Sequence, residues 1–526
     1  MNFGIYLARS ARYWPDRTAV LFRQQALSYR ALEERSNRLA HALRALGLKT
    51  GDRVALISAN RPEIVEAECA FYKLGLVKVA LNSRLSPTEL EDALHNAEPK
   101  ACIVGPAHRP VVQPMLQRLP GCTITIGWDL PVDDPQPPEA GWLDYEALLA
   151  QASAEHLHVP LQDSDLAVLH YTSGSTGKLK AAMQTMGNRM TSLRKVIMGR
   201  MQTQPDDVML LCGPITHASG MFIQPMLFQG ATILLLDRFH PAELLEAIER
   251  HRVTICFMVP AMIHALLAEP SLKTRDLSSL RLLSYGAAPM SPARIREAWE
   301  AFGPVLAQGY GAGETTGGVV SLSIADHARA ISGERPQLLS ACGRAYCESE
   351  VELLDDAGQP VALGEIGEIC LRGPDVFAGY WRAPEATREV LGDDGWLRTG
   401  DLARMDEEGY LYIVDRRKSM LVSGGFNIYP SEIESVLSQH PAIYEVCVVG
   451  VPDEHWGEAV KAVVVLRQGA QASEQALIDF CKERLADFKK PRSVDFVDSL
   501  PKNSNGKLSR KDVRERYWQG RARKVN

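Results

Sequence analysis

One short stretch, Tyr171 to Lys180 (YTSGSTGKLK), constrains the fold of this chain more than any other. Its glycines at 174 and 177 permit a tight turn that exposes backbone N–H groups, while its hydroxyls and lysines add donors and positive charge. The apolar run Leu166 to Leu169 predicts a buried strand before it, and Gly187 to Met198 predicts a helix after it. Because α/β proteins bind nucleotides where such a loop follows a strand, the stretch indicates a polyphosphate site.

This loop does not match the Walker A loop of ordinary NTPases. That template has a glycine five places before its Gly-Lys pair and a serine or threonine directly after it. Here those places hold Thr172 and Leu179. The loop alone therefore leaves two interpretations open, a different phosphate-binding loop and a solvated Ser/Gly surface loop.

Helical and strand-like segments alternate on both sides of the loop. Before it, Tyr29 to Leu46 and Pro62 to Leu74 have the pattern of helices closed by glycine, and Arg53 to Ser58 that of a buried strand. Such alternation predicts parallel sheets covered by helices. After the loop we expect further strands at Val208 to Cys212, Ala231 to Leu236, Val253 to Met258 and Leu280 to Tyr285.

The pattern changes twice in the last third of the chain. From about residue 345, short alternating strands predict antiparallel structure, at Glu350 to Leu354, Gly367 to Arg372 and Tyr410 to Val414. From about 419 a small α+β unit is expected, with helices at Ser431 to Ser438 and Ser473 to Leu485 and strands at Glu445 to Gly450 and Ala459 to Leu466. The charged DRRKS at 415–419 is the expected boundary between an N-terminal domain, 1–417, and a C-terminal domain, 418–526.

Composition and charge exclude several classes of protein. The 526 residues are 46% hydrophobic and 23% charged, which is typical of a soluble globular protein. No apolar run reaches the ~20 residues that span a bilayer, and charges occupy the start where an export signal would be apolar, so we expect a cytoplasmic protein. A net charge of -6 argues against general nucleic-acid binding. Ten scattered cysteines without a CxxC pair predict reduced thiols.

Six separated motifs, in order, resemble those of the adenylate-forming superfamily of acyl-CoA synthetases, luciferases and nonribosomal adenylation domains. The resemblance spans nearly the whole chain and implies an α/β fold with stacked helix-covered sheets, a β-rich subdomain and a small, mobile C-terminal domain. The motifs are YTSGSTGKLK, QGYGAGET at 308–315, RTGD at 398–401, DRRKS at 415–419, SGGFNIYPSEIE at 423–434 and PKNSNGK at 501–507.

The resemblance implies how ATP and Mg²⁺ are held. Lys507 corresponds to the lysine that bridges the acid and the α-phosphate during adenylation, and Glu314 with Thr176 to the magnesium ligands. Tyr310 would stack on adenine, and Asp401 and Arg416 would meet the ribose. The remaining nucleotide-binding positions that it implies are Thr172, Ser173, Gly174, Ser175, Gly177, Lys180, Ala287, Ala288 and Gly311.

It also implies a second half-reaction with a thiol, for which the C-terminal domain rotates about Lys418. Gly424 and Gly425 would let a pantetheine arm pass close to the backbone. A match to bacterial aryl-CoA ligases points to Arg84, Trp456, Phe488 and Lys490 for coenzyme A, two cations for its phosphates and two aromatics for its adenine.

The expected acyl pocket lies around His217, which corresponds to a histidine that gates the acyl site. Its other expected members are apolar or small: Gly220, Met221, Phe222, Tyr285, Gly286 and Gly309, with Ala287 and Ala288 beside them. An apolar lining disfavours an unpaired charge, so we expect an aromatic or a medium-to-long fatty carboxylate. The sequence does not name the acid, and it leaves the oligomeric state open, a homodimer included.

The chain departs from the superfamily pattern at three positions. Leu179 and Ala181 stand where proline and glycine usually flank the second loop lysine, and Gly313 stands where a threonine usually precedes the acid. We expect these changes to adjust the site and not to inactivate it.

Four functions are compatible with parts of this pattern. The leading hypothesis is an ATP-dependent acid–CoA ligase, and the runner-up is a stand-alone adenylation enzyme that loads a carrier-protein phosphopantetheine. A luciferase-like oxygenase has no particular support, and a non-catalytic nucleotide-binding protein is disfavoured because Lys180, Glu314, Asp401 and Lys507 are all present. The sequence around Lys507 also resembles a site of acetylation, so a lysine acetyltransferase and deacetylase are expected partners.

Overall fold

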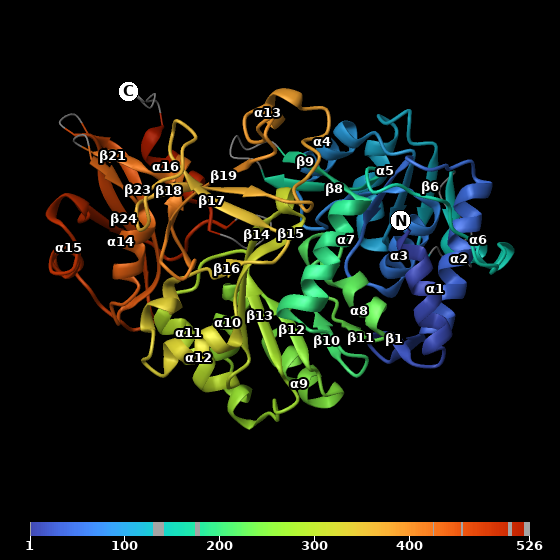
Figure 1. Ribbon diagram of the computed structural model, residues 1–526, viewed down its shortest axis with the longest axis horizontal. Coiled ribbons are helices and arrows are strands. Elements are labelled where there is room, and N and C mark those ends of the chain that lie inside the picture. Colours follow the sequence, from blue (N-terminus) through green and yellow to red (C-terminus); the bar gives the residue numbers. More distant parts are fainter. Residues whose placement is uncertain are drawn as a thin grey trace.

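A computed structural model of the chain describes residues 2–129, 141–173, 179–423, 426–453, 456–502 and 508–519. Four sheets run through these residues, and Figure 1 shows the N-terminal helices at one end of the molecule and the C-terminal sheet at the other. No helix in these ranges is both long and apolar enough to cross a membrane. The mixed α/β architecture with a smaller C-terminal part confirms the predicted fold class.

A nine-stranded sheet forms the centre of the molecule, in the order β16-β15-β14-β13-β12-β10-β11-β1-β2. Its inner strands are parallel, whereas β2 and the β14–β15–β16 edge are antiparallel. The strands are β1 (Thr18–Phe22), β2 (Gln25–Ser28), β10 (Val208–Leu211), β11 (Thr232–Leu235), β12 (Ile255–Met258), β13 (Leu282–Gly286), β14 (Leu306–Ala312), β15 (Gly317–Leu322) and β16 (Arg344–Ala345).

A seven-stranded sheet lies beside it, in the order β7-β6-β5-β3-β4-β8-β9, and only its last pair, β8–β9, is antiparallel. The strands are β3 (Arg53–Ile57), β4 (Val77–Ala80), β5 (Ala101–Val104), β6 (Ile124–Gly127), β7 (Trp142–Asp144), β8 (Leu166–Ser173) and β9 (Leu179–Thr185). The predicted strands on both sides of the glycine loop are thereby confirmed within one or two residues at their ends, except that β8 continues four residues beyond the predicted Leu169.

Helices cover these two sheets, as the alternation of segments predicted. α3 covers the predicted Pro62 to Leu74 in full and closes at Gly75, whose φ of 68° is left-handed. The helices are α1 (Phe3–Tyr13), α2 (Tyr29–Ala45), α3 (Pro62–Leu74), α4 (Pro87–Ala97), α5 (Arg109–Leu116), α6 (Tyr145–Gln151), α7 (Met186–Lys195), α8 (Ile223–Gln229), α9 (Pro241–His251), α10 (Pro260–Leu267), α11 (Pro292–Phe302), α12 (Ile324–Ile331) and α13 (Pro384–Arg388).

Two smaller sheets complete the chain, the first antiparallel and the second with one parallel pair among its strands. The order β17-β18-β19-β20 forms a four-stranded sheet, with β17 (Glu350–Leu354), β18 (Gly367–Arg372), β19 (Leu397–Met405) and β20 (Leu411–Arg416). The C-terminal sheet contains β21 (Leu421–Ser423), β22 (Phe426–Ile428), β23 (Ile443–Asp453), β24 (Gly457–Leu466) and β25 (Ser493–Phe496), with helices α14 (Pro430–Leu437), α15 (Glu474–Lys482) and α16 (Arg510–Trp518). One sheet ends at 416 and the next begins at 421; the boundary at 417/418 stays a prediction.

The glycine loop is flanked differently from the expected strand, loop and helix. β9 is inserted before α7 and pairs with β8, with Thr172 opposite Lys180. Leu179 is partly buried and packs against a core cluster, and Ala181 is a buried member of that cluster. The two departures from the superfamily pattern are therefore strand positions that fill the core.

The helix after the loop is also shorter than predicted. α7 ends at Lys195, and Val196–Arg200 form a π-helical turn in which Gly199 has the non-helical angles φ −96° and ψ −106°. A Cβ at Gly199 would lie 2.6 Å from the ring of Tyr346, so only glycine fits this close approach.

Candidate active site

Three side chains from distant parts of the chain meet beside the glycine loop. Thr172, near the end of β8, donates a hydrogen bond from its hydroxyl to Glu314 Oε1 at 3.3 Å, and Tyr380 donates to the same oxygen at 2.7 Å. The ammonium of Lys180 lies 5.1 Å from the centre of the Tyr380 ring. The structure thus brings together three predicted nucleotide-site residues and adds Tyr380, which the sequence analysis missed.

Glu314 is held in place by its backbone neighbours. It lies in a short 3₁₀ turn, Gly313–Thr315, whose Gly313 carbonyl accepts from the Gln184 side chain at 2.9 Å. The Glu314 carbonyl accepts from the Phe377 N–H at 2.8 Å. Two segments, β9 and the chain after β18, therefore fix the backbone of the turn that carries the Glu314 carboxylate.

The Glu314 carboxylate fits a magnesium site of the kind that relies on phosphate oxygens. Its second oxygen, Oε2, makes no hydrogen bond to any residue that the structure describes. Within the same ranges no three His, Cys, Asp or Glu side chains cluster closely enough to hold a metal. Mg²⁺ is typically held by one or two carboxylates with substrate phosphates and water, so one free carboxylate oxygen suits it.

A second cluster surrounds Tyr310, which lies four residues before Glu314 in the sequence. Its hydroxyl donates to Asp401 Oδ2 at 2.7 Å, and Arg416 Nε donates to Asp401 Oδ1 at 3.1 Å. Burial, with the Asp401 charge in second place, raises the pKa of Tyr310 well above its ordinary value, so this phenol stays a donor. Asp401 and Arg416 lie opposite each other on β19 and β20, which explains how residues 15 apart meet.

The predicted hinge adjoins this second cluster through a buried carboxylate. Glu368, on β18, accepts from the Gly400 N–H at 2.9 Å and from Arg417 at 2.8 Å. Gly400 belongs to the RTGD motif, and Arg417 precedes the predicted hinge residue Lys418 in the 3₁₀ turn Arg417–Ser419. One carboxylate thus connects the RTGD loop to the hinge.

His217, the expected gate of the acyl pocket, is stacked on a second histidine. The ring centres of His217 and His170 lie 4.4 Å apart with planes 14° from parallel. Burial first, then the charges of His217, Arg189 and Lys78, hold the pKa of His170 well below its ordinary value, so its ring is neutral. Sequence analysis missed His170, although it directly precedes the loop motif.

His170 also explains the third departure from the superfamily pattern. A Cβ at Gly313 would lie 2.8 Å from His170 Cδ2 and 2.6 Å from Thr172 Cγ2. Since real Cβ atoms essentially never come closer than 3.0 Å, the imidazole occupies the space that a threonine at 313 would need.

The strand β14 lies close to both of its neighbours, to β13 at a predicted acyl position and to β15 at a predicted nucleotide position. A Cβ at Gly286 would overlap the Gly309 carbonyl, and one at Gly311 would overlap that of Gly317. Ala287 follows with a left-handed φ of 66°, and Ala288 comes next in the chain. Of the other predicted pocket residues, Tyr285 and Phe222 are buried, and Gly220 lies against the backbone of Ile215.

The predicted coenzyme A residues fall in two domains. Arg84 follows β4 in the N-terminal part, whereas the other three lie in the C-terminal part. Phe488 stacks on Phe426 at 4.6 Å between ring centres, and both rings are exposed. Lys490 pairs with Asp487, and Trp456 lies under the guanidinium of Arg492 at 4.5 Å. Their role with coenzyme A stays a prediction.

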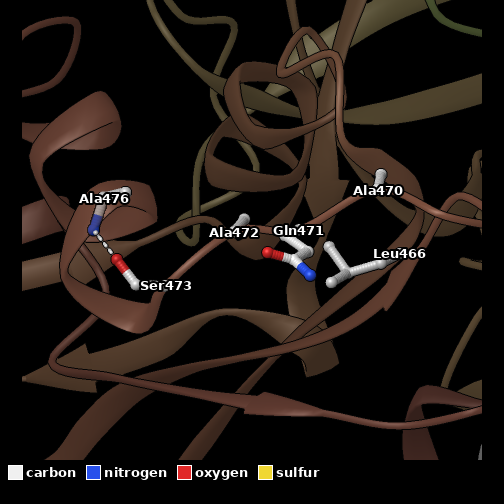
Figure 2. A pocket seen from close by; sticks show the side chains of 6 residues that line it. All are labelled: Leu466, Ala470, Gln471, Ala472, Ser473 and Ala476. Atoms are coloured by element: carbon white, nitrogen blue, oxygen red, sulfur yellow. Dashed lines mark hydrogen bonds between the residues drawn. The ribbon is translucent and has the colours of Figure 1, made fainter.

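Several predicted residues lie outside the described ranges: Lys507, Gly174, Ser175, Thr176, Gly177, Gly424 and Gly425. Ser173 ends β8. The shallow hollow in Figure 2 belongs to none of the predicted sites: it lies in the C-terminal part, where the Ser473 hydroxyl caps α15 by accepting from the Ala476 N–H.

Comparisons with known proteins identify the family of this chain. Residues 7–381 match the family of AMP-binding enzymes, and residues 432–507 match the AMP-binding enzyme C-terminal domain. A medium/long-chain-fatty-acid–CoA ligase, FadD8 of Mycobacterium tuberculosis, is 38% identical over 94% of this chain and 86% of its own length. Feruloyl-CoA synthase from an Amycolatopsis species is 38% identical over 98% of this chain and 99% of its own.

A solved structure shows the same fold. The crystal structure of ATP-bound MatB from Rhodopseudomonas palustris superimposes with a TM-score of 0.86 at 32% identity, over 98% of this chain and 99% of that one. The first match contains YTSGSTGKLK and QGYGAGET, the second contains PKNSNGK, and RTGD and DRRKS lie between the two matches. The chain therefore belongs to the family of AMP-binding enzymes, the adenylate-forming superfamily that its motifs resemble.

Proposed function

We propose that the chain is an ATP- and Mg²⁺-dependent carboxylic acid–CoA ligase, which forms an acyl-adenylate with release of pyrophosphate and then acyl-CoA with release of AMP. The observation that carries the proposal is the position of Tyr310 and Glu314. They lie four residues apart, and each is the centre of one cluster, with Asp401 and Arg416 on one side and Thr172 and Tyr380 on the other. A nucleotide placed between them has donors or acceptors for its ribose and its phosphates.

In the first half-reaction a carboxylate oxygen attacks the α-phosphate of ATP, and the bond to pyrophosphate breaks. Two anions approach each other, so the site needs fixed positive charge. Lys507 would bridge the acid and the α-phosphate, Lys180 would face the outer phosphates, and Glu314 Oε2 would bind Mg²⁺, which neutralises the leaving pyrophosphate.

The Asp401 carboxylate would accept hydrogen bonds from the two ribose hydroxyls. Each carboxylate oxygen has two acceptor positions, and the structure uses one of each for Tyr310 and Arg416. Arg416 is 75% exposed, so its side chain is free to move toward the sugar without breaking core packing.

In the second half-reaction the thiol of coenzyme A attacks the acyl carbon, and AMP leaves. Rotation of residues 418–526 about Lys418 would withdraw Lys507 and present the C-terminal residues Gly424, Gly425, Trp456, Phe488 and Lys490 with Arg84. The exposed, stacked rings of Phe488 and Phe426 would give a face for the adenine of coenzyme A.

The acid is proposed to be aromatic or a medium-to-long-chain fatty acid. The two relatives named for a fatty acid and for ferulate support this range. The runner-up function is the loading of a carrier-protein phosphopantetheine, which uses the same first half-reaction. In the cell we propose a cytoplasmic enzyme.

A panel of benzoates, phenylpropanoids and C4 to C16 fatty acids, assayed for pyrophosphate and AMP release with and without coenzyme A, tests the proposal. We expect coenzyme A and Mg²⁺ to be required for sustained AMP release with at least one acid. Pyrophosphate release without use of coenzyme A would favour the runner-up, and no release with any acid would contradict both functions.

Two variants sharpen this test. Lys507→Ala should lower adenylation on the order of 10²–10³-fold, as loss of one electrostatic donor does. Lys511→Ala is the matched control, because Lys511 lies on α16 with an exposed side chain that pairs with Glu515. An equal loss of adenylation in both variants would indicate that Lys507 contributes only to the total positive charge of the C-terminal segment.

Regulation by acetylation of Lys507 is part of the proposal. Acetylation removes the charge that the first half-reaction needs. Incubation with an acetyltransferase and acetyl-CoA should add one acetyl group at Lys507 and abolish adenylation, and a deacetylase should restore it. Mass spectrometry without modification at this lysine would contradict the regulation but not the catalytic function.

A further inference from the structure

Charged side chains lie directly behind the backbone of the predicted acyl pocket. Lys78 on β4 pairs with Glu68 on α3, and both are buried. Gln224 on α8 donates to Glu68 at 3.3 Å. The Lys78 ammonium is 3.5 Å from the point where a Cβ at Gly220 would lie, so the amine stands behind a residue predicted to line the pocket.

A third charge, Arg189 on α7, completes this cluster and is incompletely bonded. Its side chain is buried, with 7% of the residue exposed, and Nε donates to the Tyr72 hydroxyl at 3.2 Å. Within the described part of the chain, its two terminal nitrogens make no hydrogen bond. A guanidinium has five N–H donors, so most of its capacity is unused.

The cluster carries a net positive charge. Arg189 and Lys78 are cations, Glu68 is the single carboxylate among them, and burial raises the pKa of Tyr72 to about 12, which leaves its hydroxyl neutral. The neighbouring buried cations Lys73 and Lys195 each have a carboxylate of their own. A buried cation without an anion is costly, so this arrangement favours an anionic or strongly accepting ligand.

The cluster is connected to the acyl pocket along α7. Arg189 and Ser192 are three residues apart and share one face of the helix. A Cβ at Gly317 would overlap Met221 and lie 3.4 Å from Ser192 Oγ, so Ser192 and Met221 converge on the same point. Met221 is a predicted pocket residue, and Arg189 lies about one helical turn before Ser192 on α7.

We propose that Arg189, supported by the Lys78–Glu68 pair, binds an oxygen-bearing group at the end of the acid remote from the reacting carboxylate. A second carboxylate would bind most strongly, because a guanidinium pairs with it through two parallel hydrogen bonds and its charge balances the cluster. A hydroxyl or carbonyl would bind less strongly. This inference rests on the proposed function and narrows it to acids with a polar far end, against plain fatty acids.

Matched acids test the inference. The aliphatic series compares decanedioate with decanoate. The aromatic series compares 4-carboxycinnamate and 4-hydroxycinnamate with 4-methylcinnamate. Within each series the acids differ only at the end remote from the reacting carboxylate. We expect kcat/KM for AMP release to be at least about tenfold higher for the preferred polar acid of one series, since a polar site rejects an analogue that leaves it unpaired.

Variants at two arginines of α7 show whether the preference for polar-ended acids depends on Arg189. Arg189→Met should remove the preference for the polar acid while it keeps or improves turnover of the methyl-ended acid. Arg194→Met is the matched control, because Arg194 is on the same helix with a half-exposed side chain that pairs with Glu348. It should retain the wild-type preference.

Stability separates binding from folding. If Arg189 is a buried cation held for a ligand, the melting temperature of Arg189→Met should equal or exceed that of the wild type, and the polar acid should raise only the wild-type value. If Arg189→Met does not fold, the ratio of kcat/KM values that the wild-type enzyme shows for the matched acids tests the inference. Equal use of matched acids overturns the inference and leaves the proposed function intact, whereas no turnover of any acid contradicts both.

Discussion

The two ends of the candidate site treat charge in opposite ways. At the nucleotide end, Glu314 and Asp401 each receive a tyrosine hydroxyl and retain acceptor capacity for a ligand. At the acyl end, Arg189 and Lys78 are buried cations that outnumber their single carboxylate, Glu68. In the proposed function, the carboxylates of one end bind a metal and a sugar, and the donors of the other end bind an oxygen of the acid.

This difference indicates which end defines the reaction and which defines the substrate. The predicted residues of the nucleotide end belong to short motifs in or next to strands, so their geometry follows largely from the local backbone. The acyl end takes one charge from each of α3, β4 and α7, so single substitutions can alter it without disturbing the sheet. Changes at the first end should therefore affect all substrates equally, and changes at the second should affect them selectively.

The largest effect is expected at Asp401. Asp401→Ala should lower kcat/KM for ATP about 10²- to 10⁴-fold, because two hydrogen bonds to a charged group, at roughly 1.5–3 kcal/mol each, are lost. The loss should be equal for every acid in the panel. Asp401→Asn keeps one oxygen and should lose less; a selective loss with one acid would contradict the separation of the two ends.

The next effect concerns the support of the acyl end at low pH. Tyr285 shares a 2.9 Å hydrogen bond with His327 Nε2, and burial lowers the pKa of His327 to about 4. The unfolded chain has a histidine pKa near 6.5, so it binds the proton more readily than the folded chain does. Stability should therefore be full above pH 6.5 and fall by up to about 3 kcal/mol toward pH 4.

His327→Gln isolates this contribution, since glutamine keeps hydrogen-bonding groups but does not titrate. Unfolding free energies of both proteins, measured by urea denaturation between pH 7 and pH 4, should converge as the pH falls. Parallel curves would show that His327 does not titrate in this window.

The sequence singled out several residues of the nucleotide end that the structure brings together, and there is a physical reason for this. Tyr310, Glu314 and Asp401 occur in short motifs whose glycines and neighbouring strands fix the local backbone, so a few residues determine their placement. Tyr380, His170 and Arg189 have no such local pattern, and their contacts join segments up to 208 residues apart, as Thr172 and Tyr380 illustrate with their shared acceptor. Only the tertiary packing of α3, α7 and the two large sheets reveals them.

An intermediate effect is expected where the two ends meet, at Gly313. Gly313→Thr restores the usual superfamily residue but forces its Cβ against His170 and Thr172, which should destabilise the fold by about 1–3 kcal/mol. The added variant His170→Ala should recover more than about 0.5 kcal/mol of this loss, because residues in contact are not additive. Thermal unfolding of the single and double variants measures the coupling, and strict additivity would refute the compensation.

The smallest effect is expected at Tyr380, which positions Glu314. Tyr380→Phe removes the hydroxyl that donates to Glu314 Oε1 at 2.7 Å and keeps the ring beside Lys180. Loss of one hydrogen bond to a carboxylate should raise the Mg²⁺ concentration needed for half-maximal activity about tenfold, with equal change for all acids.

Tyr412→Phe is the matched control for this variant. Its hydroxyl donates to a carboxylate in the same way, to Asp406 at 2.9 Å, but within the four-stranded sheet and its turn, away from both ends of the site. Since the chemistry of the two substitutions is identical, only the place of Tyr380 beside Glu314 can produce a difference in Mg²⁺ dependence. An unchanged Mg²⁺ requirement in Tyr380→Phe, or an equal rise in Tyr412→Phe, would separate Tyr380 from the metal site and leave Glu314 oriented by its backbone contacts alone.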